Sequence, residues 1–211
     1  ALRPDPITTE NPPLRFALRY IDEAHPYLAS RGLTRPTIRT FGLGLYTGKG
    51  VLRGRVVIPI HNASGQLIAY AGRAIDSREP KYRFPAGFHK SLALFNFHRA
   101  IATKASTVVV VEGFFDTLVV HQAGYPVVGL MGSTLSRHQA DLLHGSFNGA
   151  VLMLDGDEPG RHGAMRVAEA LGARMSVSVI SLEDGRQPDQ LTTEEIRRLL
   201  RAGGPADSGD H

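Results

Sequence analysis

The sequence predicts an α/β fold in which a parallel sheet with flanking helices is preceded by a smaller, mixed α+β basic subdomain. From Thr107 onward, β-rich runs alternate with helical segments, which is typical of a parallel sheet with crossover helices. The first half instead contains short helical segments and a hairpin signal. Charge divides in the same way. Residues 1–104 carry 16 Lys and Arg against 6 Asp and Glu, a net charge of +10, whereas residues 105–211 carry 8 against 14, a net charge of −6.

The first half begins with residues 1–13, which are rich in Pro and polar groups and are expected to form a tail. Leu14, Leu18 and Ile21 recur at helical spacing and predict a helix. A second helical stretch is expected to end near Arg31 and Gly32.

A third short helix is predicted from Thr34 to Phe41, with Thr34 as its cap and Pro36 in its first turn. The period of the apolar residues then changes from helical to extended. Arg55–Ile60 and Leu67–Arg73 are β-rich and are joined by Asn62-Ala63-Ser64-Gly65, which predicts a β-hairpin.

The second half, residues 105–201, is expected to contain four strands and four helices. The predicted strands are 107–112, 126–131, 150–154 and 175–181. The predicted helices are 114–123, 136–144, 159–171 and 193–201. Ser136 with Gln139, and Thr192 with Glu195, have the spacing of capping boxes at two of the helix starts. Residues 14–104 form the expected first subdomain, and residues 202–211 are expected to be a disordered tail.

Composition narrows the functional classes. The 211 residues can bury a real core as one compact domain or two small ones. The absence of Cys excludes disulfides, thiolate zinc sites and cysteine nucleophiles, and the nine His lack the His-Glu-x-x-His spacing. We see no secretory signal or long apolar span and expect a cytoplasmic protein without membrane contact. A chain that starts at Ala1 is expected to be a fragment.

Two apolar runs each end in carboxylates, which is the most informative feature of the chain. Glu112 and Asp116 follow the first run, and Asp155 and Asp157 follow the second. Because ligands of open α/β sheets bind beyond the carboxyl ends of the strands, these acids are placed for function. Mg²⁺ prefers such oxygen donors. An isolated Asp-Gly-Asp is more often a solvated turn, but two acid clusters in one domain favour a divalent-metal site.

The geometry of an extended chain adds a second expectation. Asp155 and Asp157 should point the same way, and Gly156 should let a ligand or another backbone segment approach closely.

A basic half joined to an acidic half suits a polyanion that one part holds and the other acts on.

The acid clusters also resemble a known family. Val111-Glu112-Gly113-x-x-Asp116, Asp155-Gly156-Asp157-x-x-Gly160 and Pro188-Asp189 are similar to the three signatures of the TOPRIM domain of primases, topoisomerases and some nucleases. The resemblance covers roughly residues 105–200. Motifs of the first half appear in the order found in the catalytic core of bacterial DnaG-type primases. They are Tyr27-Leu28-x-x-Arg31-Gly32-Leu33-Thr34, Gly54-Arg55-Val56, Pro59-Ile60, Gly72-Arg73, Pro80-Lys81-Tyr82 and Phe88-His89-Lys90.

The resemblance implies a DNA primase-like nucleotidyltransferase core of bacterial or mobile-element origin, which synthesises short RNA primers on single-stranded DNA from nucleoside triphosphates. It implies that Glu112, Asp155 and Asp157 are catalytic and bind Mg²⁺ or Mn²⁺, with support from Asp116 and Asp189. It also implies that basic side chains face template or nucleotide phosphates, namely Arg55, Arg73, Lys81 and Lys90. A zinc-binding module and a helicase domain or protein are expected outside this chain, which contains no zinc site.

The chain departs from the family pattern in two motifs. Gln187-Pro188-Asp189 stands where the family usually has Asp-Pro-Asp, which removes one acid and bears on a second metal ion. The segment between Lys81 and Phe88 is short and lacks the usual Asn-Ser-Pro-Glu-Thr run.

Two alternatives remain open. One is a TOPRIM nuclease that uses water in place of the hydroxyl, with Glu112 as a base. The other is a non-catalytic nucleic-acid-binding module of a larger replication protein. Gly48-Lys49 lacks the spacing of a P-loop, and none of the six Tyr has the context of a topoisomerase nucleophile.

Overall fold

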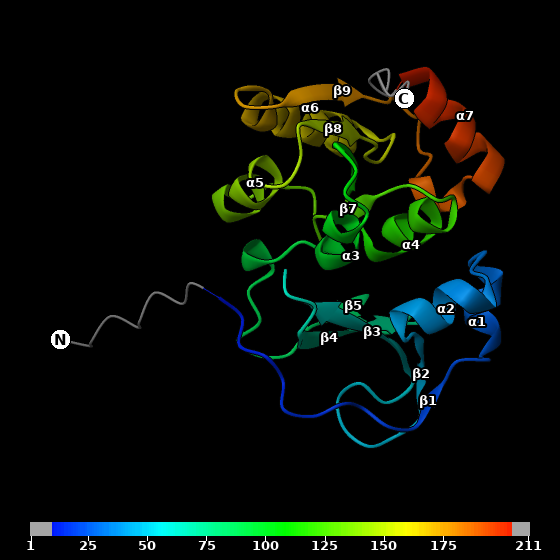
Figure 1. The fold of residues 1–211 in the computed structure, drawn as a ribbon. Coiled ribbons are helices and arrows are strands. Elements are labelled where there is room, and N and C mark those ends of the chain that lie inside the picture. Colours follow the sequence, from blue (N-terminus) through cyan, green and yellow to red (C-terminus); the bar gives the residue numbers. More distant parts are fainter. Residues whose placement is uncertain (1–9, 204–211) are drawn as a thin grey trace.

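The computed structural model describes residues 10–203 and contains two sheets (Figure 1). The antiparallel sheet has the order β1-β2-β3-β4-β5 and the parallel sheet the order β7-β6-β8-β9. The strands of the antiparallel sheet are β1 (Ile21–Asp22), β2 (Gly44–Tyr46), β3 (Arg55–His61), β4 (Leu67–Ala74) and β5 (Tyr82–Arg83). Those of the parallel sheet are β6 (Thr107–Val111), β7 (Val127–Gly129), β8 (Gly149–Leu152) and β9 (Ser176–Val179).

The helices are α1 (Pro26–Ser30), α2 (Arg35–Phe41), α3 (Phe97–Ala102), α4 (Phe114–Gln122), α5 (Arg137–His144), α6 (Glu158–Gly172) and α7 (Thr193–Gly203). Two short 3₁₀ turns are η1 (Lys90–Leu92) and η2 (Pro188–Gln190). Figure 1 shows α1 and α2 beside the antiparallel sheet, α5 and α6 beside the parallel sheet, and α3 and α4 between the two parts. The predicted alternation of strands and helices after Thr107 is confirmed, although individual ends differ by a few residues.

Helix starts follow the predicted caps. The Thr34 side chain accepts a hydrogen bond from the Thr37 amide at the start of α2. Ser136 and Gln139 form a reciprocal capping box at α5. Thr192 and Glu195 exchange the same type of hydrogen bonds before α7. These polar side chains satisfy amides that have no partner inside the first turn, and so they fix where each helix begins.

The register of the parallel sheet brings the two acid clusters together. Val110 of β6 lies opposite Leu152 of β8 on one side and opposite Val128 of β7 on the other. Both β6 and β8 end within two residues of this pairing. The segments that carry Glu112 and Asp155 therefore leave the sheet side by side.

Side-chain alternation along β6 divides the interior into two cores. Val108 and Val110 pack in a cluster with residues of α5 and α6. Val109 and Val111 pack in a second cluster with residues of α1, α2 and the antiparallel sheet, such as Leu28. A strand that is covered on both faces explains the unbroken run of Val. The second cluster also joins the two halves of the chain through one continuous apolar interior.

The amino-terminal segment differs from expectation. The predicted helix over Leu14–Ile21 is wrong: residues before β1 run as irregular chain along the antiparallel sheet. The Leu14 amide donates to the Leu67 carbonyl at 2.7 Å, and the Leu18 amide donates to the Tyr70 hydroxyl at 3.1 Å. Hydrogen bonds to the sheet replace those that a helix would have made, because tertiary contacts override a short local pattern.

Parts of the two expected tails can be placed. Residues 1–9 and 204–211 lie outside the described part of the chain. Asn11 is buried and exchanges two hydrogen bonds of 2.9 Å with the backbone of His89. Residues 202 and 203 continue α7. Over residues 10–203, we find no helix with the length and apolar character needed to cross a bilayer.

Candidate functional site

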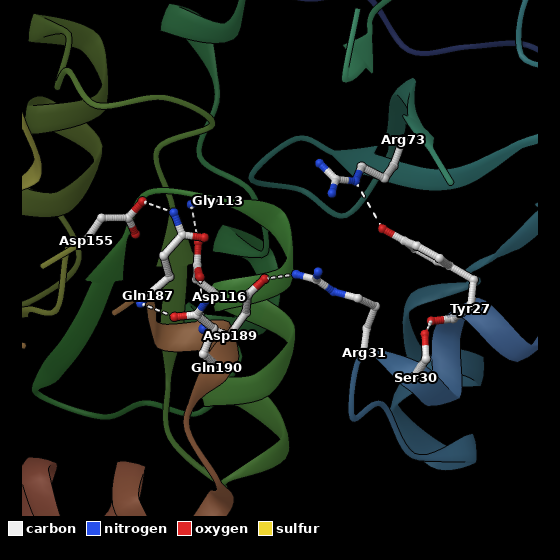
Figure 2. Close-up of polar contacts among 10 residues, drawn as sticks. All are labelled: Tyr27, Ser30, Arg31, Arg73, Gly113, Asp116, Asp155, Gln187, Asp189 and Gln190. Carbon is white, nitrogen blue, oxygen red and sulfur yellow. Dashed lines mark hydrogen bonds and ion pairs between the residues drawn. The ribbon is translucent and has the colours of Figure 1, made fainter. Parts of the chain in front are cut away.

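Glu112 and Asp155 lie together at the carboxyl edge of the parallel sheet. The Asp155 amide lies 3.4 Å from Glu112 Oε1 and donates to it. Gln187, from the loop before η2, donates its side-chain amide to Asp155 Oδ2 at 2.8 Å (Figure 2). The backbone amide of Asp155 thus joins the two strand ends, and the neutral Gln187 side chain fixes the Asp155 carboxylate.

Asp116 forms the inner part of the site. It lies in the first turn of α4 with 8% of its surface exposed. It accepts hydrogen bonds from the amides of Gly113 at 2.9 Å and Asp189 at 3.0 Å. Burial, reinforced by the charge of Asp189, raises the pKa of Asp116 to about 6. Asp116 therefore acts as an anchor that ties η2 to the start of α4.

Arg31 connects the basic half to this acidic edge. Its guanidinium forms an ion pair with Asp189, and its planar group lies over the Phe115 ring, 5.0 Å from the centroid. Figure 2 shows Arg31 reaching from the residues after α1 to Asp189. This ion pair therefore links the end of α1 to η2 across the site.

Gly156 explains how the loop carrying Gln187 comes so close. A Cβ at this position would lie 2.2 Å from the Glu183 carbonyl oxygen and 3.0 Å from that of Arg186. The Gly156 amide instead donates to the Arg186 carbonyl at 2.8 Å. The prediction that Gly156 permits close approach is confirmed, and the group that approaches is backbone.

Asp157 follows the end of strand β8, and the expected common direction of Asp155 and Asp157 stays a prediction. Strand β8 ends at Leu152, and the alternation of side chains does not extend to these residues. Asp157 is exposed and caps α6 by accepting a 2.8 Å hydrogen bond from the Gly160 amide. Its charge still raises the pKa values of Glu112 and Asp155, so it lies near the pair at the rim of the site.

One cleft, with a volume of about 460 Å³, is lined both by predicted phosphate-binding cations and by predicted metal-binding acids. Its basic residues are Arg31, Arg73, Lys81 and Lys90, and its acidic residues are Glu112, Asp116, Asp155 and Asp189. The cations come from the first half of the chain and the acids from the second. The structure thus brings together three of the four predicted phosphate contacts with four of the five predicted metal ligands.

Arg55 is the predicted contact that the structure places elsewhere. It is 3% exposed. Its guanidinium donates to the carbonyls of Gly72 at 3.2 Å and Pro80 at 2.8 Å. Arg55 therefore ties β4 to the residues before β5. The expectation that it faces template or nucleotide phosphates is wrong, because the side chain is buried and its Nη1 donates to backbone carbonyls of its own subdomain.

Sequence reasoning did not assign a role in the site to three further residues. Arg31 was visible only as part of a motif at a helix end. Tyr27, whose hydroxyl accepts a 3.2 Å hydrogen bond from Arg73 Nε, belongs to the same motif (Figure 2). Phe84, which also lines the cleft, lies in the segment where the chain departs from the family pattern.

The electrostatics of the acidic edge suit a cation. Burial, together with the charges of Asp116 and Glu112, raises the pKa of Asp155 to about 7. Burial also raises the pKa of Glu112. Asp155 Oδ1 is buried and has no hydrogen-bond partner among residues 10–203. Carboxylates that repel one another, and an oxygen left unsatisfied, are both stabilised by a hard divalent ion.

These carboxylates fit an ion that the protein holds through few side chains. The side chains of residues 10–203, as they stand, form no group of three or more His, Asp or Glu that could hold a metal. Mg²⁺, however, is usually held by one or two carboxylates together with water and substrate phosphates. Glu112 and Asp155 meet this requirement, and Asp157, whose Oδ1 caps α6, lies beside them at the rim of the site.

Comparisons with known proteins agree with this architecture. Residues 109–192 match the family model described as Toprim-like, and residues 47–101 match that of the N-terminal domain of the DNA primase catalytic core. The DNA primase of Geobacillus stearothermophilus is 33% identical over 196 residues, which cover 83% of this chain and 32% of the relative. The zinc-binding and RNA polymerase domains of the Aquifex aeolicus primase superpose with a TM-score of 0.75 at 30% identity, covering 86% of this chain and 56% of that one.

The chain belongs to the DnaG-type DNA primase family. The structure of a DnaG primase catalytic domain bound to single-stranded DNA is also similar, with a TM-score of 0.74 at 25% identity, covering 86% of this chain and 71% of that one. The resemblance inferred from the TOPRIM signatures and the basic motifs is thereby confirmed, as is the fold class. This DnaG-type core spans 32–39% of the length of three curated primases that it matches.

Proposed function

We propose that this chain is a primase catalytic core, a metal-dependent nucleotidyltransferase that joins ribonucleoside triphosphates into short primers on single-stranded DNA. The observation that carries the proposal is the composition of the cleft, in which Glu112 and Asp155 face cations from the other half of the chain. Phosphoryl transfer needs positioning and charge neutralisation more than a side-chain nucleophile. The cleft offers carboxylates that could hold a metal ion and cations that could neutralise phosphate charge.

Each side of the cleft has its own task. Glu112 and Asp155 would hold a divalent cation, which neutralises phosphate charge and favours the deprotonated form of an attacking 3′-hydroxyl. Gln187 keeps Asp155 in place through its 2.8 Å hydrogen bond. Lys81 and Lys90 are exposed at the cleft and bind phosphate groups by charge.

Arg73 is a further side chain that can donate hydrogen bonds to a phosphate group. Its Nη1 is buried without a hydrogen-bond partner among the described residues, while Nε is held by Tyr27. The guanidinium also lies over the Tyr82 ring, 5.0 Å from its centroid. A guanidinium that is fixed on two sides and unsatisfied on the third is prepared to bind an anion.

The partners follow from the same reasoning. The template is single-stranded DNA, held mainly through its phosphates by the basic half. The Aquifex aeolicus relative carries a zinc-binding domain in its solved structure. A module of that kind and a helicase, both outside this chain, would supply template choice and recruitment. The ion would be Mg²⁺ or Mn²⁺.

The test is synthesis of primers from ribonucleoside triphosphates and Mg²⁺ on single-stranded DNA. The Glu112→Gln variant removes one charge with little change in shape, and Glu169→Gln makes the same change at an exposed position of α6. New products that Glu169→Gln retains and Glu112→Gln loses would support the proposal. Shortened DNA would instead indicate a nuclease, and DNA binding without either product would indicate a non-catalytic module. Either result would overturn it.

A further inference from the structure

We infer that Phe84 is the surface on which the base of the incoming nucleotide stacks. This inference deepens the proposed function and rests on it. Phe84 follows β5 in the segment between Lys81 and Phe88, where the chain departs from the polar run of its family. It lines the cleft and is only partly buried. An aromatic ring at the wall of a charged cleft is a common platform for nucleobases.

Neighbouring rings hold Phe84 in a defined orientation. The Phe88 ring is nearly parallel to it, with an interplanar angle of 10° and centroids 5.7 Å apart. Phe114, at the start of α4, lies 6.1 Å away at an interplanar angle of 33°. Phe114 is buried in the core shared by the two halves. Phe84 is therefore anchored to the rigid part of the fold while part of its ring remains accessible.

Lys90 already covers the accessible ring. Its Nζ lies 5.5 Å from the Phe84 centroid. A cation over an aromatic face at the surface is held by a weak interaction, so it can be displaced. A bound nucleotide would place its base on the ring, and its phosphates would attract the displaced ammonium. The same pair of residues can thus recognise both ends of a nucleotide.

The rest of the cleft fits the phosphates of that nucleotide. Arg73 and Lys81 line it together with Phe84, and the unsatisfied Nη1 of Arg73 is an additional donor. Glu112 and Asp155 form its acidic side. A triphosphate that extends from Phe84 would pass the cations and reach the carboxylates. This arrangement favours the incoming nucleotide as the occupant over a base of the template.

The sequence contains no Trp, which makes a direct test possible. Phe84→Trp introduces a single fluorophore into the proposed stacking site. We expect ATP with Mg²⁺, in the absence of template, to quench its fluorescence saturably. Inorganic tripolyphosphate carries the same phosphates without a base and should cause little quenching. Phe16→Trp is the matched control, because Phe16 is 59% exposed and does not line the cleft.

Kinetics supply an independent readout. Phe84→Leu keeps apolar volume against Phe114 but removes the ring face, whereas Phe84→Tyr keeps the ring. We expect Phe84→Leu to raise KM for nucleotide about 5- to 30-fold with kcat largely retained, the factor that corresponds to about 1–2 kcal/mol of base stacking. Phe84→Tyr should restore KM to near the wild-type value.

Three results would overturn the inference. They are equal quenching by ATP and tripolyphosphate, quenching by single-stranded DNA but not by ATP, and an unchanged KM in a folded Phe84→Leu protein. Because the fluorescence assay needs no primer synthesis, its failure is distinguishable from failure of the proposed function. Primer synthesis that depends on Glu112, without a response at position 84, would remove only this inference.

Discussion

Gln187 donates a 2.8 Å hydrogen bond to Asp155 Oδ2, so a neutral amide occupies one oxygen of the carboxylate at the centre of the cleft. The second oxygen, Oδ1, is buried and has no partner among residues 10–203. Oδ1 is therefore the oxygen of Asp155 at which a cation would meet no competing hydrogen bond. The amide also spares the site a further negative charge at this position.

Replacing this amide by an acid should make the protein depend more on metal. In Gln187→Glu, a carboxylate faces Asp155 and repels it, so we expect the melting temperature in EDTA at pH 8 to fall by about 2–5 °C. Mg²⁺ should raise it more than in the wild-type protein. Gln66→Glu, an exposed change in the turn between β3 and β4, is the control for differential scanning fluorimetry. An equal Mg²⁺ response in both variants would contradict this reading of Gln187.

The metal-free protein should lose stability as pH rises toward neutrality. The pKa of Asp155 is about 7 in the folded protein, against an ordinary value of 3.8, so the folded state binds more protons between these values. Stability therefore falls as pH rises through this range. From pH 6 to pH 8, we expect a loss of about 1 kcal/mol in the free energy of unfolding, relative to Asp155→Asn.

Urea unfolding in EDTA measures this difference. The comparison with Asp155→Asn cancels the contribution of the half-buried His61, His98 and His121, whose pKa values are lowered by partial burial. Adding Mg²⁺ should reduce the pH dependence of the wild-type protein, because the ion binds the deprotonated carboxylates. A wild-type protein that gains stability from pH 6 to pH 8 relative to the variant would show that the pKa of Asp155 is not raised in the folded protein.

The Arg31–Asp189 pair should contribute to stability far more than an exposed pair. The two side chains are 31% and 8% exposed, so removing the guanidinium leaves Asp189 buried without its partner. We expect Arg31→Ala to lower the free energy of unfolding by about 1–3 kcal/mol. Arg39→Ala breaks a 4.0 Å pair with Glu23 whose side chains are 74% and 51% exposed, and should cost less than about 0.5 kcal/mol. Equal losses for both variants in urea would refute the structural role of Arg31.

Substitutions of Arg55 and Lys81 should affect different properties, namely stability for Arg55 and binding for Lys81. Arg55→Met removes the bonds to two interior carbonyls, and we expect it to lower stability by about 2–3 kcal/mol. Lys81→Met should leave the melting temperature unchanged. It should weaken binding of single-stranded DNA or nucleotide and reduce the slope of log affinity against log salt by about 0.7. An unaltered slope for Lys81→Met would exclude a phosphate contact.

Local signals in the sequence predicted much of the fold. Thr34, Ser136 and Thr192 are caps whose hydrogen bonds join residues three positions apart, so their effect is visible in the chain itself. The run of Val in β6 predicts a strand covered on both faces. The meeting of Glu112 with Asp155 depends on β6 and β8 being neighbours, which the alternation of strands and helices does not specify and the TOPRIM resemblance implies.

The parts that could not be predicted depend on distant contacts. Whether Arg55 faces phosphates or interior carbonyls depends on β4 and on Pro80, which local pattern does not place. That Asp157 caps α6 depends on where β8 ends and α6 begins, and its role toward a metal stays a prediction. The contact of Gln187 with Asp155 spans 32 positions and needs the close approach at Gly156.

The central claim is that a divalent cation binds where Glu112 meets Asp155. Isothermal titration of Mn²⁺ into the metal-free protein at pH 8, beside the Glu112→Gln and Asp155→Asn variants, tests it most directly. We predict saturable uptake of at least one ion by the wild-type protein and a loss of affinity of tenfold or more in either variant. No uptake by the wild-type protein, or uptake that both variants retain unchanged, would contradict the claim.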